Sequence, residues 1–232
     1  MVRIGQVDLD RESGIVAAIG RDAIDTAKQA RSMGANILEV RLDLLGIRDI
    51  DEAAALLKDL KEQVGLPIIT TNRCTGEGGQ WSGSEADRIE LLISTIEGAD
   101  AVDVELSAPL RSKVVDAAKS AGKTIIISSH DFTTTPSTDV MQSTLAQARD
   151  AGADIAKLAV TPGSTSDTLR LLEVTHQAGI PVCTIAMGRL GAHTRVVAPL
   201  YGSVLTYGAV DEAMAPGQLK IDELKHMLEL LS

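Results

Sequence analysis

A lysine interrupts a short run that otherwise has the composition of a buried β-strand, the segment DIAKLAV at residues 154–160. Successive side chains of a strand point to opposite faces, so Ile155, Lys157 and Ala159 share one face. The other face is apolar throughout and suits packing against helices. The alternation therefore predicts that Lys157 points into the interior of a sheet.

An interior lysine is a candidate nucleophile. Burial, or a nearby cation such as an arginine, depresses the pKa of the amine, and a neutral amine can attack a carbonyl to form a Schiff base. The alternative is that Lys157 only forms a salt bridge with Glu39 or Asp43. The two roles can coexist, and we favour the nucleophile.

Three further ionisable residues alternate along the run ILEVRLD at residues 37–43. Glu39, Arg41 and Asp43 share one face of this strand, with apolar residues between them. A solvated edge strand would show the same pattern. The chain, however, has eight strand-like runs, the number that forms a closed barrel, and a strand inside a closed barrel has no exposed edge. We therefore expect all three charged side chains to point inward.

A histidine ends another strand-like run, in the sequence SSHDF at residues 128–132. A lone histidine is more often structural than catalytic, but one at the mouth of a barrel is well placed for proton transfer near neutral pH. The glycine-rich loop after Arg73 carries Glu77, and its glycines allow it to fold over a pocket. The sequence leaves open whether Asp131 or a loop carboxylate orients His130.

The last third of the chain offers groups for an anionic ligand. Arg195 and Ser203 occur in MGRLGAHTRVVAPLYGS at residues 187–203, where a barrel usually binds such a group. The segment APGQ, which ends at Gln218, is by itself only a turn.

The elements that must position these residues alternate between strand and helix. Helical patterns with stop signals separate runs that are too short and too β-branched to be independent helices. The predicted strands are 15–20, 37–43, 67–73, 101–107, 124–132, 154–160, 181–187 and 204–208. Eight strands that each precede a helical segment predict a single (β/α)8 TIM barrel of the α/β class. An open doubly wound sheet is the alternative, but no glycine-rich phosphate fingerprint follows the first strand.

Composition sets the class of protein. The chain of 232 residues has 44% apolar residues and a net charge of −10, and this acidic balance argues against a nucleic-acid partner or an anionic membrane partner. Two distant cysteines and the absence of an apolar leader predict a cytoplasmic protein. We expect one domain, residues 1–232, in which the first ten residues cover the barrel floor.

As an ordered set, these motifs resemble type I 3-dehydroquinate dehydratase, the Schiff-base family of the shikimate pathway. The resemblance covers nearly the whole chain. It rests on EVRLD, on R followed by EGG, and on SSHDF, GADIAKLAVTP, MG with an R eight residues after the Met, YGS and APGQ. The family implies a small-molecule substrate, 3-dehydroquinate, no metal or organic cofactor, and a homodimer.

The resemblance also implies residue roles. Lys157 forms the imine with the C3 ketone of the substrate, and His130 removes the C2 proton and later protonates the departing C1 hydroxyl. Glu77 contacts the substrate or assists the site, and Arg195 pairs with the substrate carboxylate. Four residues hold ring hydroxyls and neighbouring side chains: Glu39, Arg41, Arg73 and Gln218. Met187 and Tyr207 line the pocket, and Tyr207 stands where relatives often have Phe.

One position departs from the family pattern. Met214 stands where some relatives carry Ser, three residues before the glycine of PGQ, and a thioether cannot make the hydrogen bonds of a hydroxyl. A class I aldolase-type barrel and a non-catalytic sensor of a quinate-like ligand are the rival interpretations. The pairing of Lys157 with His130 disfavours the sensor, because binding alone needs neither a nucleophile nor a base.

Overall fold

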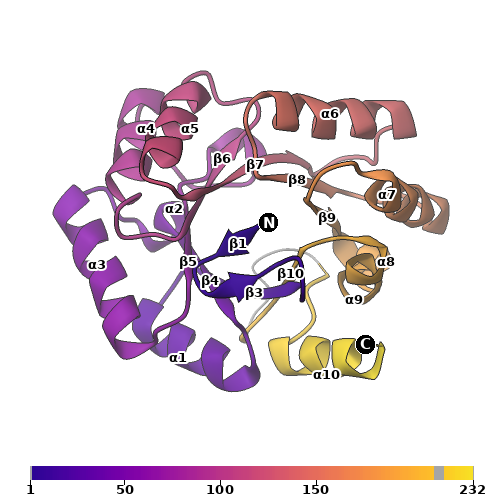
Figure 1. The fold of residues 1–232 in the computed structure, drawn as a ribbon, viewed down its shortest axis with the longest axis horizontal. Helices are drawn as coiled ribbons and strands as arrows, with labels where there is room; N and C mark the ends of the chain where they lie inside the picture. Colours follow the sequence, from indigo (N-terminus) through magenta and orange to yellow (C-terminus); the bar gives the residue numbers. More distant parts are fainter. Residues whose placement is uncertain (1, 212–216, 232) are drawn as a thin grey trace.

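Eight parallel strands form the centre of the computed structural model, which describes residues 2–211 and 217–231 (Figure 1). The strands are β3 (Gly14–Ile19), β4 (Ile37–Arg41), β5 (Ile68–Thr71), β6 (Ala101–Glu105), β7 (Thr124–Asp131), β8 (Ile155–Val160), β9 (Val182–Ala186) and β10 (Leu205–Gly208). β10 pairs with β3, and the backbone N–H of Val204, just before β10, donates to the carbonyl of Val182 in β9 at 2.8 Å. The sheet is thereby a nearly closed barrel, which confirms the predicted fold class.

Helices surround the barrel in the order that a βα repeat requires (Figure 1). The α-helices are α1 (Ala23–Met33), α2 (Leu42–Leu45), α3 (Ile50–Gln63), α4 (Glu85–Ser94), α5 (Arg111–Ser120), α6 (Thr138–Asp150), α7 (Thr165–Gln177), α8 (Gly188–Gly191), α9 (Thr194–Val197) and α10 (Ile221–Leu231). Two 3₁₀ turns are η1 (Thr75–Glu77) and η2 (Ala198–Tyr201). No helix in the described part of the chain is long and apolar enough to cross a bilayer.

Local sequence fixes where two of the longer helices, α3 and α4, begin. The side chain of Asp49 accepts a hydrogen bond from the backbone N–H of Glu52 at the start of α3, and Ser84 caps α4 in the same way. These acceptors satisfy backbone donors that the first turn of a helix leaves unpaired. α3 and α4 therefore start at residues that the sequence itself marks.

The alternation predicted for β8 divides its side chains between two apolar clusters. Ile155 and Ala159 pack in the cluster inside the barrel, whereas Ala156, Leu158 and Val160 pack in a cluster that includes side chains of the outer helices. Lys157 is therefore on the inner face. All six residues of β8 are buried, so the strand is fixed from both sides.

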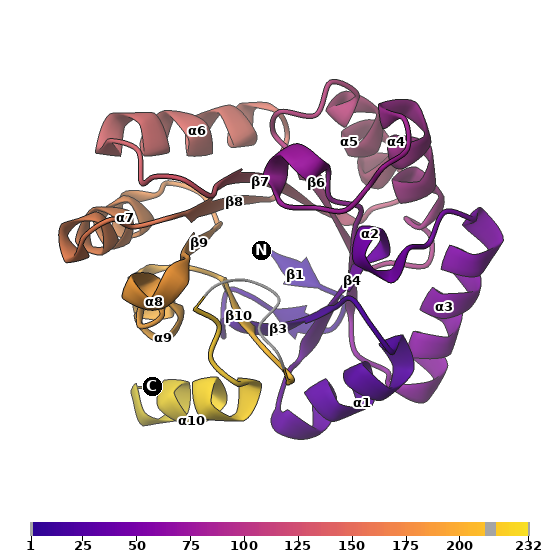
Figure 2. The same cartoon turned by 180° about the vertical axis from the view of Figure 1, so that it is seen from behind.

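A short N-terminal hairpin covers the floor of the barrel. β1 (Arg3–Ile4) pairs antiparallel with β2 (Val7–Asp8), and the buried side chains of Ile4 and Val7 join the interior cluster. The hairpin lies across the barrel in Figure 1 and behind the barrel strands in Figure 2. The amino-terminal end is thus closed, and the opposite end of the barrel remains for a ligand.

Candidate active site

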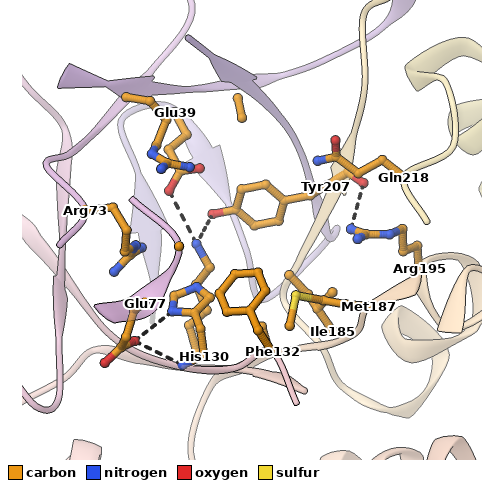
Figure 3. Close-up of a pocket in the computed structure, with 15 residues that line it drawn as sticks. Glu39, Arg73, Glu77, His130, Phe132, Ile185, Met187, Arg195, Tyr207 and Gln218 are labelled. Atoms are coloured by element: carbon orange, nitrogen blue, oxygen red, sulfur yellow. Dashed lines mark hydrogen bonds and ion pairs between the residues drawn. The ribbon is translucent and has the colours of Figure 1, made fainter. Parts of the chain in front are cut away.

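Ten residues singled out in the sequence line one pocket at the carboxyl-terminal end of the barrel strands (Figure 3). They come from β4, β7, β8 and β10, from η1 and α9, and from the loops that follow the strands. They are Glu39, Arg41, Arg73, Glu77, His130, Lys157, Met187, Arg195, Tyr207 and Gln218. Active sites of (β/α)8 barrels lie at this end.

Two other predicted site residues are not among them. Ser203 precedes β10 and lies toward its amino-terminal end, where its hydroxyl donates to the carbonyl of Leu205 at 2.9 Å and accepts from the backbone N–H of Thr184 at 3.2 Å. This position disagrees with the prediction that Ser203 contacts the substrate, because its hydroxyl is bonded to the backbone of β9 and β10 and the residue does not line the pocket. Met214 lies outside the described residues.

The amine of Lys157 is surrounded by oxygen acceptors. Its Nζ donates to Oδ2 of Asp103 at 3.0 Å, to Oε1 of Glu39 at 3.3 Å and to the hydroxyl of Tyr207 at 3.0 Å. An ammonium carries three N–H donors, so these acceptors match its full donor capacity. The side chain is buried, and the geometry therefore favours the charged form.

Electrostatics confirm this preference. Burial alone lowers the pKa of Lys157, but the adjacent charges of Asp103 and Glu39 outweigh burial and hold the pKa well above its usual value. The prediction of a depressed pKa is therefore wrong for this structure, because carboxylates rather than cations surround the amine. The predicted salt bridge to Glu39 is present alongside the candidate nucleophile.

Asp103 is a site residue that the sequence motifs do not reveal. It accepts from Lys157, from Nη2 of Arg73 at 2.8 Å and from the hydroxyl of Ser128 at 2.6 Å. Burial opposes its ionisation, but the positive charges of Arg73 and Lys157 hold its pKa below the usual range. A signal that could have found it is the alternation of charged and apolar residues along β6, where Asp103 and Glu105 share one face, as Glu39 and Arg41 do in β4.

Arg73 is bound within the barrel rather than extended toward the pocket mouth. Its guanidinium contacts Asp103, the hydroxyl of Ser128 at 2.7 Å and Oε1 of Glu105 at 3.2 Å. Burial opposes its charge, but Asp103 and Glu105 raise its pKa further above the usual value. Because Glu105 also pairs with the buried Arg88 at 2.8 Å, the site rests on a charge network that extends to α4.

Arg41 is held at the end of β4 by Asp43. Nε and Nη2 of Arg41 donate to the two carboxylate oxygens at 2.9 and 2.8 Å, a bidentate geometry that fixes the guanidinium plane. Asp43 also accepts from the backbone N–H groups of Arg73 and Gln80. Since β4 ends at Arg41 and Asp43 belongs to α2, the prediction that Asp43 points into the barrel from a strand is wrong.

Glu77 orients His130 from the 3₁₀ turn η1. Its Oε2 lies 2.9 Å from Nδ1 of His130 and accepts from the backbone N–H of the same residue at 3.0 Å, while Oε1 accepts from the hydroxyl of Ser107 at 2.6 Å. Asp131 instead accepts from Thr133. The structure therefore decides between the two alternatives in favour of the loop carboxylate, which leaves Nε2 of His130 for proton transfer.

A close backbone approach requires glycine beside this carboxylate. A Cβ on Gly79 would lie 2.0 Å from the carbonyl oxygen of Arg73, so no other residue fits without moving the backbone. Gly78 has a φ of +78°, and the ring of Phe132 covers it closely. Phe132 lines the pocket and stacks on His130 with ring centroids 6.4 Å apart. The sequence analysis did not single out Phe132 as a site residue, and the signal for it was its position in the SSHDF motif.

Glu77→Gln is expected to lower kcat by about 10–100-fold. Glutamine keeps the shape of the side chain but removes the charge that holds the imidazole, and a hydrogen bond to a charged group is worth about 1.5–3 kcal/mol. Steady-state turnover measures this, with Asp131→Asn as the matched control. A kcat unchanged in Glu77→Gln would show that the carboxylate does not orient the base.

His130 is neutral near physiological pH. Burial, together with the positive charges of Arg73 and Lys157, holds its pKa well below the usual 6.5. A neutral imidazole accepts a proton through the nitrogen that carries no hydrogen. The arrangement therefore presents a base at pH 7.

The lowered pKa of His130 has a consequence for stability. Below pH 6.5 the histidine of the unfolded chain is protonated while His130 of the folded chain stays neutral. Each further pH unit downward therefore lowers the free energy of unfolding by at most about 1.4 kcal/mol through this residue. His130→Gln removes the titration. Urea unfolding should show that the wild type loses more stability than this variant between pH 7 and pH 5, and equal losses would contradict the lowered pKa.

Arg195 lines the pocket on the side opposite Arg73 (Figure 3). Its Nε donates to the carbonyl of Gly217 at 3.0 Å and its Nη1 to the carbonyl of Tyr207 at 3.3 Å, and Gln218 lies beside it (Figure 3). Burial lowers the pKa of Arg195 to about 10, in contrast to the raised pKa of Arg73 among its carboxylates. A ligand carboxylate at this wall would offset the cost of burying the cation.

Comparison with known proteins identifies the family of this chain. Residues 15–232 match the family model described as type I 3-dehydroquinase. The chain is 55% identical to the 3-dehydroquinate dehydratase of Methanosarcina barkeri, with complete coverage of both chains. It is similar to the crystal structure of 3-dehydroquinate dehydratase from Geobacillus kaustophilus, with 33% identity and a TM-score of 0.88 over 95% of this chain and 91% of that one. It is also similar to the crystal structure of the type I enzyme from Clostridium difficile with covalently modified comenic acid, with 30% identity and a TM-score of 0.92 over 99% of this chain and 96% of that one. The chain belongs to the type I 3-dehydroquinase family.

Proposed function

We propose that this protein converts 3-dehydroquinate to 3-dehydroshikimate and water through an imine on Lys157, the hydro-lyase step of the shikimate pathway that leads to aromatic amino acids. The observation that carries the proposal is one pocket that contains a buried lysine among carboxylates, a neutral histidine and a buried arginine. The family and the relatives named above support the same reaction.

Binding begins with the substrate carboxylate at Arg195. Arg41, fixed by Asp43, and Glu39 and Gln218 lie around the same pocket and offer donors and acceptors to ring hydroxyls. Met187 supplies an apolar wall. We infer that a substrate held by this set would direct its C3 ketone toward the amine of Lys157, which lines the same pocket.

Imine formation requires that the Lys157 ammonium first loses a proton. Its nitrogen then bonds to C3, and the ketone oxygen takes up the released proton and one further N–H proton and leaves as water, so that a protonated imine results. The cation that forms on nitrogen remains beside Asp103 and Glu39, which lie 3.0 and 3.3 Å from the amine. These carboxylates therefore stabilise the positive charge both before and after the bond forms.

The protonated imine is an electron sink for the elimination. His130 takes the C2 proton, the electron pair of the C–H bond flows to the imine nitrogen, and the resulting enamine expels the C1 hydroxyl. The histidine returns its proton to that leaving group, so water departs. Hydrolysis of the product imine restores Lys157, and proton transfer of this kind contributes about 10²–10⁴-fold to the rate.

Borohydride reduction in the presence of 3-dehydroquinate tests the proposal. We expect peptide mass mapping to find the reduced adduct on Lys157, and absorbance of the conjugated enone product to grow during turnover. An aldolase-type activity would give trapping with an aldol substrate but no enone, and a sensor would give no product. Absence of an adduct on Lys157 would overturn the imine mechanism.

We also propose that residues 1–232 form one catalytic domain that works in the cytoplasm as a homodimer. Cys74 and Cys183 are free thiols, which suits a reducing compartment. Leu200 and Tyr201 in η2 are exposed, and exposed apolar surface is typical of interfaces. Light scattering should give twice the mass of one chain, and a single-chain mass would contradict the dimer.

A further inference from the structure

The hydroxyl of Tyr207 is the partner of Lys157 that the mechanism above does not use. Tyr207 lies near the end of β10, is 4% exposed and lines the pocket. Its hydroxyl oxygen accepts a hydrogen bond from Nζ of Lys157 at 3.0 Å, and the same Nζ lies 4.4 Å from the centre of its ring. The hydroxyl is therefore fixed beside the reacting atom.

The other two partners of the amine, Asp103 and Glu39, also accept hydrogen bonds from other side chains. Asp103 also holds Arg73, and Glu39 accepts from the hydroxyl of Thr71 at 2.8 Å. Within residues 2–211 and 217–231, the Tyr207 hydroxyl makes its hydrogen bond with Lys157. An ionised carboxylate only accepts hydrogen bonds, whereas a hydroxyl that accepts from an ammonium keeps its own hydrogen for another acceptor. Tyr207 thus has a donor to offer inside the pocket.

Imine formation creates an acceptor for this donor. When the amine attacks the ketone carbon, the π electrons of the carbonyl move to oxygen, which becomes negatively charged. That oxygen is two bonds from Nζ, so a hydroxyl 3.0 Å from Nζ is within reach of it. Donors aimed at such a developing charge are worth more than the same donors in water.

We propose that Tyr207 is a catalytic residue of imine formation, because its hydroxyl donates a hydrogen bond to the ketone oxygen as Lys157 adds to the carbonyl. The nitrogen loses a proton and the oxygen gains one, so the carbinolamine is neutral, and the O–H bond of Tyr207 stays intact. Burial and the charge of Glu39 raise the pKa of Tyr207 well above its usual value, which keeps it a donor. The inference rests on the proposed function.

Tyr207→Phe tests the inference because it removes the hydroxyl and keeps the ring. The enzyme is mixed with 3-dehydroquinate, borohydride is added after increasing times, and the modified fraction of the Lys157 peptide gives the rate of imine formation. We expect this rate to fall by about 10²–10³-fold, the usual cost of losing a donor to an oxyanion. The affinity for quinate, which has no ketone, should change by less than about twofold.

Tyr201→Phe is the matched control, because Tyr201 is exposed in η2. It should leave both the trapping rate and quinate binding unchanged. Trapping within threefold of the wild type in Tyr207→Phe would overturn the inference alone, as would an equal loss of trapping rate and quinate affinity, which would make Tyr207 a binding group. Absence of trapping in the wild type would instead overturn the proposed function and this inference together.

Discussion

Lys157→Ala is expected to abolish both turnover and the borohydride adduct. Every covalent step of the proposed reaction passes through Nζ, and no other amine of the described residues is bound to Glu39 and Asp103 together. Mass mapping after reduction and the enone absorbance assay measure the two losses. Lys113→Ala, which removes an exposed lysine of α5, is the control and should retain both signals.

The same variant should also lose stability. Removing one member of a buried ion pair leaves the partner charge uncompensated and typically costs about 3–5 kcal/mol. Asp103 keeps Arg73 and Glu39 keeps the hydroxyl of Thr71, so we expect the lower end of this range. Urea unfolding at pH 7 gives the value. A variant that still forms the adduct, or that unfolds with wild-type free energy, would contradict the central place of Lys157.

His130→Ala is expected to separate imine formation from dehydration. The variant should still give the reduced adduct on Lys157, because the carboxylates and the amine remain in place. Its turnover should fall by about 10²–10⁴-fold, since the proton transfers at C2 and at the leaving hydroxyl lose their general acid and base. Exchange of the C2 proton with deuterated solvent should slow by a similar factor.

His226→Ala provides the comparison, because His226 is exposed on α10. Its turnover, adduct formation and C2 exchange should match the wild type. Wild-type turnover in His130→Ala would remove the histidine from the chemistry. Loss of the adduct together with turnover would assign His130 to imine formation as well, and would contradict the separation expected here.

Sequence patterns were sufficient for the arrangement of the barrel. Strand composition and helix stop signals act over a few residues, so β8 and its inward-pointing Lys157 followed from alternation alone. Strand ends were less accessible. The run at 37–43 has strand character throughout, yet the chain turns into α2 after Arg41 because Asp43 is held by contacts to Arg73 and Gln80 that lie far along the sequence.

The alternation of strand and helix patterns determined the fold class, and the ordered set of motifs determined the family and ten of the residues that line the pocket, because each depends on residue type and spacing. Only the tertiary structure showed that Glu77 holds His130, that Asp103 holds Lys157, and that the Ser203 hydroxyl is bonded to the backbone of β9. The protonation of Lys157 also depended on it, since a pKa is set by the distance to charges on other strands rather than by the neighbours in the chain. The sequence therefore located the nucleophile, and the packing of β4 and β6 against β8 across the barrel decided its charge.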